Sequence, residues 1–450
     1  MTLKNCIIFF FCCFLANSTV AQKAWTLDEC IDYAIAHNLE LNDFKYTNNA
    51  SKEAYKQSVR DLLPNLMGYS DYNIRYGRSI NPNTNDIINT DFFSNNYSLS
   101  SSVAIFKGFQ KVNTIKASKL LYKAAQEDVL QQKYMLAFRV MSAFYDIRFF
   151  EGLVTISEEQ LLASQTSYDL VKRQVDIGLK AGADLYEAES VLLTDQLVVT
   201  QNKNSLEAAQ LKLIQEMNLE GETSIQINNA LDELTQVSTE SQTLHQDSIF
   251  KTANAFIPLI KSETFRAEAA KKDVAIARGD LYPSLTLSSG YSTGYYETNV
   301  DDLGGIIPYK TQINDNISKF VGVSLNIPIF NRWSSRSNIK QNKIALNRAT
   351  NNLNIKKQEL YKLIQQLVQD KKAFVVESEQ STKKMKAQEL TFSIAQKKYE
   401  KGMISAIELY QAKNLFATSQ NENLQVKLQL KITEKTIDFY KGLPIFNIKK

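Results

Sequence analysis

Histidine and cysteine are scarce in this chain, which argues against metal and catalytic chemistry. The two histidines, His37 and His245, have no second histidine or cysteine at metal-ligand spacing, so surface or packing roles are favoured. A glycine-rich phosphate loop followed by Lys-Ser or Lys-Thr is absent too. We therefore expect no catalytic residue, no cofactor and no metal, and predict that the protein is not an enzyme. Its mixed charges, with a net charge of +4, give no indication of a nucleic-acid partner.

Long apolar runs are also scarce. The compact run from Ile7 to Leu15 follows Lys4 and precedes small residues at Thr19–Ala21, which is typical of a secretory signal peptide over residues 1–21. Three of the four cysteines lie in this segment, so Cys30 would be the lone thiol of the mature chain and no intramolecular disulfide could form. No later run approaches the roughly 20 residues that a membrane-spanning helix needs. A bilayer could therefore be crossed only as a barrel.

The second half of the sequence repeats the first. Matching residues recur 219 positions later in one region and 224 positions later in the next, so the extra residues belong to a loop. Examples are Pro64 with Pro283, Tyr72 with Tyr291, Phe106 with Phe330, Gly178 with Gly402, and Tyr186 with Tyr410. We predict two repeats, 22–235 and 236–450, each with a short helix, a strand, a loop, a strand, a very long helix, a tight turn and a helix.

Proline is absent and glycine almost absent from 109–176 and from 334–401, where apolar residues recur at three- and four-residue steps. At 1.5 Å per residue, each stretch predicts a helix of roughly 100 Å. Such a helix cannot wrap a compact core, so we expect it to pack as a coiled coil against helices over 184–217 and 406–440.

Shorter helices are predicted before each strand region. The first runs from Thr26 to about Leu62 and opens with a capping box formed by Thr26 and Glu29. The second runs from about Asp247 to Leu281 and is expected to break or kink at Pro258.

Four segments alternate between apolar and small polar residues. They predict strands over about 65–78, 96–106, 284–297 and 319–330, joined by external loops. The residues expected to face lipid are Tyr97, Leu99, Val103, Val323, Leu325 and Ile327, and those expected to face water are Ser98, Ser100, Ser102, Ser324 and Asn326. This polarity is typical of a transmembrane barrel with a wet lumen. Because four strands cannot close a barrel and open edges cannot face lipid, we expect three copies to share twelve strands.

Several short motifs, in this order and duplicated, point to one family. They are the opening Thr26–Ala34 with Asn38, the strand entries Leu63-Pro64 and Tyr282-Pro283, the strand exits Ile105–Gly108 and Ile327–Asn331, and the turns at Gly178 and Gly402. Over essentially the whole mature length the chain resembles the TolC-like outer-membrane efflux proteins. The resemblance implies a mainly α fold with a transmembrane β part. It also implies a homotrimer in the outer membrane of a Gram-negative bacterium, whose periplasmic α-helical tunnel docks onto a periplasmic adaptor (membrane fusion) protein and an inner-membrane RND or ABC pump.

The turns between the long helices are the candidate functional site. Gly178 and Gly402 are expected at helix ends with positive φ. Together with Leu179 and Met403 they form the predicted tip turns for adaptor docking.

Two acids, Asp184 and Glu408, occupy the same repeat position in the first turn of the returning helix. Helix capping explains an acid there. In a trimer, however, six carboxylates would also form a cation-selective constriction. The resemblance implies that Glu408 lines an acidic constriction, that Asp184 helps to hold neighbouring tips closed, and that Tyr399 is a closing tyrosine. The chain departs from the family pattern at Gln411 and Ile404, where some members carry a second acid and a closing arginine.

The leading hypothesis is a passive exit duct for a tripartite efflux or type I secretion system, driven by the pump. The alternative is a non-conducting structural or adhesive periplasmic coiled-coil assembly, which the strand polarity disfavours because a soluble sheet would invert it. Drugs, metal ions, siderophores and polypeptides all stay open as cargo, since specificity lies mainly in the pump.

Overall fold

The computed structural model describes residues 24–80, 85–89, 91–222, 224–228 and 245–448; the predicted signal peptide lies outside them. The chain divides into two compact units. The first, here the helical unit, comprises the described residues within Met1–Phe44, Val129–Pro258 and Lys357–Lys450. The second, the sheet unit, comprises those within Lys45–Asp128 and Leu259–Lys356. Each unit takes segments from both halves of the sequence.

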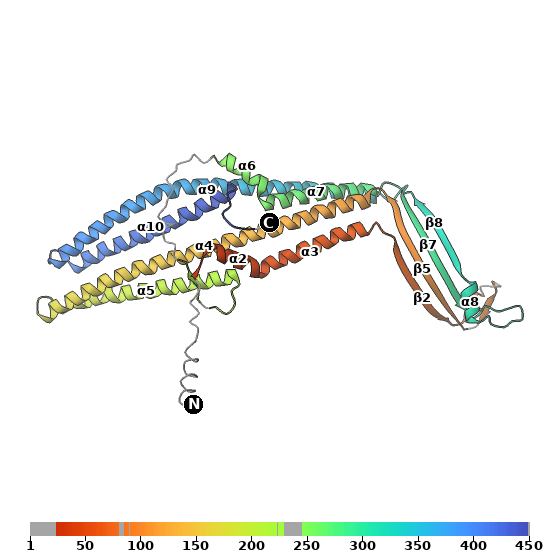
Figure 1. Cartoon of the computed structure of the whole chain (residues 1–450), viewed down its shortest axis with the longest axis horizontal. Helices are drawn as coiled ribbons and strands as arrows, with labels where there is room; N and C mark the ends of the chain where they lie inside the picture. The colour runs from red at the N-terminus through yellow and green to blue at the C-terminus, as the bar shows by residue number, and fades with distance from the viewer. Residues whose placement is uncertain (1–23, 81–84, 90, 223, 229–244, 449–450) are drawn as a thin grey trace, which may run out of the picture. The chain divides into compact units, whose positions relative to one another are not determined.

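A four-stranded antiparallel sheet dominates the sheet unit (Figure 1). Its order is β2 (Asn65–Arg75), β5 (Phe92–Lys107), β7 (Ser284–Tyr296) and β8 (Ser318–Asn326). All four predicted strands are present, with shifted ends. β5 begins before the predicted residue 96, whereas β8 ends at Asn326 and not near residue 330. Pro328, two residues after this end, has no backbone N–H to donate to a neighbouring strand.

The register places the two predicted sets of strand residues on opposite faces. Val103 pairs with Leu287, which pairs with Val323 on the next strand. Ser102 pairs with Ser288 and lies on the other face, since neighbouring residues of a strand alternate. Ile327 lies just beyond β8, so its predicted inclusion in the strand is wrong, and its exposure to lipid stays a prediction.

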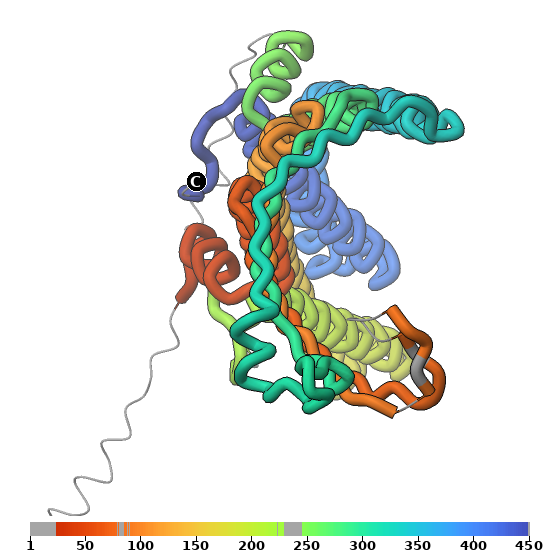
Figure 2. The backbone as a smooth tube through the Cα atoms, turned by 90° about the vertical axis from the view of Figure 1, so that its right-hand side faces the viewer, coloured from red at the N-terminus to blue at the C-terminus, as the bar shows by residue number. Residues whose placement is uncertain are grey.

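The connections expected to be plain loops contain small elements. β3 (Arg78–Ile80) pairs with β4 (Ile87–Asn89), and α8 (Tyr309–Asp315) packs beside the end of β7 (Figures 1 and 2). Gln312 of α8 is almost fully buried. Its side-chain amide donates to the carbonyls of Tyr296 (3.0 Å) and Ile307 (2.8 Å) and accepts the Tyr296 N–H (3.1 Å). The long loop is therefore anchored to the strand end through one satisfied amide.

The long helices agree with the sequence prediction. They are α4 (Gln110–Asp176), α5 (Gly182–Met217), α9 (Ser334–Glu400) and α10 (Ala406–Tyr440). In the helical unit, the C-terminal part of α4 pairs with α5, and that of α9 with α10, as two helical hairpins (Figure 1). Apolar side chains at helical spacing are buried in this unit, among them Leu136, Val140 and Ile147 of α4, Leu213 of α5 and Leu430 of α10.

The first entry helix is divided, which corrects the prediction of one helix from Thr26 to Leu62. α2 (Leu27–His37) and α3 (Leu39–Arg60) meet at Asn38, whose ψ of 122° is extended. The Asn38 side-chain oxygen accepts the Leu41 N–H at 2.8 Å and so caps the second helix. The predicted Thr26–Glu29 capping box is confirmed.

The second entry helix also has two parts, α6 (Gln246–Phe256) and α7 (Pro258–Gly279), and the predicted break at Pro258 is confirmed. A two-residue parallel pairing joins β1 (Ala24–Trp25) to β6 (Gln226–Ile227). Cys30 is buried and forms no disulfide within the described residues. Among the helices in the described part of the chain, none has both the length and the apolarity of a membrane span.

Candidate functional site

The two helical hairpins of the helical unit end in tip turns of the same geometry. Gly178 has φ of 77° and Gly402 has φ of 70°, as predicted for helix-ending glycines. The Gly178 N–H donates to the Val175 carbonyl, and the Gly402 N–H donates to the Tyr399 carbonyl, both at 2.9 Å. A Cβ at either glycine would meet no atom within 4 Å, so positive φ, and not crowding, is what favours glycine there.

Each tip turn presents a large apolar side chain to solvent. Leu179 in the first turn is 73% exposed, and Met403 in the second is 67% exposed. Ile177 and Ile407 are exposed beside them. Apolar side chains held out on tight turns are suited to packing against another protein.

Both acids predicted at the tips cap their helices. The Glu408 carboxylate accepts the Ser405 N–H at 2.8 Å and the Ser405 hydroxyl at 3.0 Å. These hydrogen bonds, the backbone one first, lower the pKa of Glu408, so it is ionised at neutral pH. The Asp184 carboxylate accepts the Ala181 N–H at 3.2 Å, and Ala181 has no hydroxyl that could add the second hydrogen bond seen at Glu408. Glu408 and Asp184 thus both cap the returning helices, and both carboxylates lie at the tip turns.

Tyr399 lies in an apolar cluster and does not face solvent. It is buried with Val171 of α4 and Ala188 of α5. Ile404, one of the departures from the family pattern, packs against the same cluster. Lys180 of the first tip donates to the Tyr399 hydroxyl at 3.1 Å and lies 4.6 Å from the centre of its ring. Tyr399 therefore connects the second hairpin to the first through a lysine that sequence reasoning missed.

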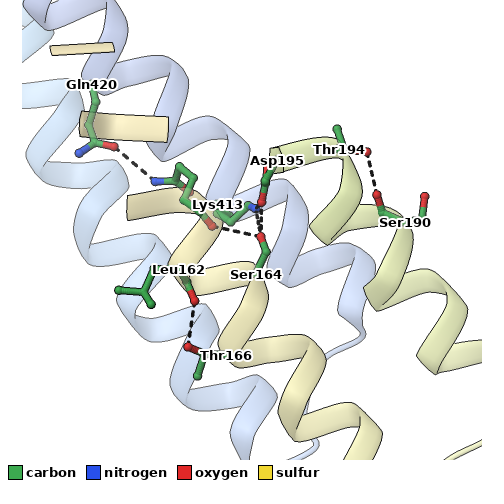
Figure 3. A network of polar contacts seen from close by, with 9 residues as sticks. Leu162, Ser164, Thr166, Ser190, Thr194, Asp195, Lys413 and Gln420 are labelled. Carbon is green, nitrogen blue, oxygen red and sulfur yellow. Dashed lines mark hydrogen bonds and ion pairs between the residues drawn. The ribbon is translucent and has the colours of Figure 1, made fainter. Parts of the chain in front are cut away.

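A second connection between the hairpins was also missed. Lys413 of α10 forms an ion pair with Asp195 of α5, and both contact Ser164 of α4 (Figure 3). All three residues are buried. The 224-residue repeat could have indicated this group, because the charges differ at the matching positions. The repeat aligns Asp195 with the neutral Ser419, and it aligns Lys413 with the acidic Glu189.

Groups of three or more His, Cys, Asp or Glu side chains that could hold a metal ion do not occur among the described residues.

Comparison with known proteins identifies the chain. A family model described as "Outer membrane efflux protein" matches residues 30–219 and 252–443, and the chain belongs to this family. It is 22% identical over 308 residues to the outer membrane efflux protein BepC of Brucella suis biovar 1 (strain 1330), a match that covers 68% of this chain and 63% of BepC, just under two thirds. It is 22% identical over 403 residues to the cation efflux system protein CusC of Escherichia coli (strain K12), which covers 87% of this chain and 80% of CusC.

A crystal structure of CusC has the same fold, with a TM-score of 0.77 over 95% of this chain and 96% of that chain at 18% identity. The protein is a TolC-like efflux component of the Gram-negative outer membrane and serves as an exit duct, not as an enzyme.

Proposed function

We propose that three copies of this chain form one duct whose transmembrane part is a shared twelve-stranded barrel. The observation that carries the proposal is the four-stranded sheet of the sheet unit. Within the described residues, β2 and β8 each pair on one side only. Their outer backbone groups would be unsatisfied in lipid, so a sheet placed in a bilayer has to pair these edges with another chain.

Strand direction permits this closure. The sheet is antiparallel throughout, so its two edge strands, β2 and β8, run in opposite directions. The β8 of one copy can therefore pair with the β2 of the next in the same antiparallel pattern. Three sheets of four strands give twelve strands with no free edge, which is large enough to enclose a lumen.

The side chains support a lipid-facing exterior. Leu99, Val323 and Leu325 are exposed on one face of the sheet, although apolar side chains of a soluble sheet would be covered. Serines lie on the opposite face, for example Ser98 opposite Ser292. A polar lumen and an apolar exterior are the pattern of an outer-membrane barrel.

The tips supply the second part of the proposal. Around the threefold axis of a trimer, Glu408 and Asp184 would place six carboxylates at the periplasmic end of the tunnel and make its constriction cation-selective. The exposed Leu179 and Met403, beside Gly178 and Gly402, would dock a periplasmic adaptor protein, which links the duct to an RND or ABC pump in the inner membrane. Tyr399 and Lys180 would hold the tips of one chain together.

Crosslinking tests the shared barrel. A cysteine at Met67 or Tyr69 of β2 is combined with one at Phe320 or Gly322 of β8, in a Cys30→Ala background, so that all four pairs lie on the polar face of the sheet. At least one pair should give covalent dimers and trimers on oxidation of intact membranes.

The matched control is Ser98→Cys with Ser292→Cys, which are direct partners on β5 and β7 of one chain. This pair should form a disulfide within one chain, so the oxidised protein should keep the mass of a monomer. Only monomers in all four edge-strand pairs, alongside an oxidised control, would contradict the shared barrel.

A further inference from the structure

The apolar face of the four-stranded sheet carries one charged side chain. Lys319 of β8 pairs with Tyr291, which pairs with Leu99, so all three lie in one row on the face expected to meet lipid. Asp71 and Arg75 of β2 lie on the polar face. Within the described strands β2, β5, β7 and β8, no second charged residue lies on the apolar face. An ionisable residue that faces lipid is costly, so it marks a candidate functional site.

Lys319 has no acidic partner among the described residues. Its ammonium lies 5.8 Å from the centre of the Tyr291 ring, in a cation–π contact. In the proposed barrel, the next copy adds its β2 beside β8. The β2 residues on the apolar face are Leu66, Gly68, Ser70, Tyr72 and Ile74. None of these is acidic, so the ammonium is left to bind water or an anion from outside the protein.

The apolar face is hollowed beside Lys319. The hollow has a volume of about 360 Å³, and its lining includes Lys319, Tyr291, Leu99, Ser101, Ser289 and Val321. Ser101 and Ser289 are direct partners in one row, between Leu66 and Val321, so two small side chains leave space between larger ones. Such small polar residues are unexpected on a lipid-facing surface, where apolar side chains prevail. We call this hollow the serine groove.

The serine groove is charged at its outer end. Lys319 precedes Val321 by two residues, so it lies one row nearer the loop end of the sheet, where α8 is found (Figure 1). α8 contacts the next row outward on the same face, where the Tyr309 hydroxyl donates to the Tyr97 hydroxyl at 3.0 Å. A lipid of the outer leaflet has the same polarity, because its phosphates point outward and its acyl chains point toward the midplane.

We propose that the serine groove binds one phosphorylated lipid of the outer leaflet, with a phosphate on the Lys319 ammonium and an acyl chain along Ser101 and Ser289. Lysine binds phosphate through charge-assisted hydrogen bonds. The outer leaflet of a Gram-negative outer membrane is built from lipopolysaccharide, whose lipid A carries both phosphates and acyl chains. The proposal rests on the proposed function, because the shared barrel places the loop end of the sheet in that leaflet.

Titration of the purified, detergent-solubilised protein with diphosphorylated lipid A tests the charge, with bound lipid counted by native mass spectrometry. Lys319→Gln should weaken binding about tenfold, since one charge-assisted contact is lost. Lys319→Arg keeps the charge and should bind lipid A as wild type does. The matched control is Arg75→Gln, which removes a cation from the polar face, where it lies 5.9 Å from the Phe92 ring centre. It should leave binding unchanged.

The groove is tested apart from the charge. Ser289→Leu fills the space of the acyl chain and should weaken binding of lipid A about threefold or more, with assembly intact because leucine suits a lipid-facing position. Ser288→Leu, at the neighbouring residue on the polar face, should bind lipid A as wild type does. Equal binding by wild type and Ser289→Leu would contradict the seat of the chain.

Dephosphorylated lipid A separates the phosphate from the rest of the lipid. Wild type and Lys319→Gln should bind it equally, because the partner of the lysine is then absent. A difference as large as that seen with diphosphorylated lipid A would contradict the assigned contact.

Crosslinking in intact outer membranes identifies the source of the lipid. A photoreactive phenylalanine analogue in place of Val321, inside the groove, should form adducts with lipopolysaccharide on illumination. The same analogue in place of Gly322, on the polar face, should form no lipid adduct. Adducts of the Val321 position with phospholipid alone would contradict a ligand from the outer leaflet.

Equal binding of lipid A by wild type and Lys319→Gln, or equal loss in Lys319→Gln and Lys319→Arg, would contradict the role of the charge. Each of these results leaves the shared barrel intact if the edge-strand cysteine pairs of β2 and β8 give covalent trimers. Only monomers in those pairs would contradict the barrel, and the outer-leaflet site with it.

Discussion

Replacement of Val323 by arginine should prevent assembly of the barrel, and the neighbouring replacement Ser324→Arg should not. Val323 is one residue from the middle of β8 and is 62% exposed in the single chain. It continues an apolar row through Leu287 and Val103. Ser324 pairs with Thr286 and points to the opposite face. The two variants therefore place the same charge one residue apart, in lipid or in the lumen.

The magnitude follows from the proposed threefold symmetry. An arginine on the lipid face costs about 2 to 4 kcal/mol near the bilayer midplane. Three copies of Val323→Arg then destabilise the trimer by about 6 to 12 kcal/mol. Val323 is largely exposed in the single chain, so little of this value comes from reduced packing within the sheet. Ser324→Arg should change trimer stability by less than about 1 kcal/mol per chain, because its side chain remains in water.

Heat-modified gel mobility of outer-membrane extracts measures the result. Trimers of wild type and of Ser324→Arg should be present in similar amounts and dissociate at similar temperatures, whereas Val323→Arg should give few or no trimers. Equal loss of trimers in both variants, or normal trimers in both, would refute the assignment of the two faces.

Three further predictions concern the helical unit. Glu408→Gln, alone or with Asp184→Asn, should reduce the preference of the channel for cations and the block of its current by multivalent cations on the periplasmic side, with trimer yield unchanged. Unchanged reversal potentials in both variants would limit the two acids to helix capping. Gly402→Ala forces an L side chain into φ of 70° and should destabilise the tip by about 1 kcal/mol, which would be seen as faster proteolysis there. Met403→Ala, at the exposed neighbouring residue, should not change the rate of proteolysis. Equal proteolysis of the two variants would contradict the strain argument. Burial raises the pKa of Tyr440 to about 12, so between about pH 10 and pH 12 only the unfolded state loses this proton, and the free energy of unfolding falls by up to about 2.7 kcal/mol. Over that pH range, Tyr440→Phe should show a smaller drop in the midpoint of unfolding than wild type. An equal drop would exclude this tyrosine as a cause.

Most of the fold follows from local patterns. The three- and four-residue periodicity of α4 and α9, the alternation in β5 and β8, and Gly178 and Gly402 each constrain their own segment, so one sequence suffices to predict them. The division at Asn38 was missed because asparagine is only a weak local signal inside an amphipathic pattern. There the capping of Leu41 overrides the continuing periodicity.

The parts of the site that were missed depend on distant pairs. Lys180 contacts Tyr399 across 219 positions of sequence, and Lys413 contacts Asp195 across 218. A charged residue in an amphipathic helix is usually solvated, and its own segment does not show that a partner of opposite charge lies across the hairpin boundary. The tip acids, in contrast, were found because the repeat aligns Asp184 with Glu408.

Ion current through the purified wild-type protein in planar bilayers tests most directly whether three copies form a duct. The expected result is insertion as a trimer that carries small, cation-preferring currents at rest, with discrete steps to a larger conductance when the tip hairpins part. A membrane-inserted wild-type protein whose current matches the protein-free bilayer would contradict the duct.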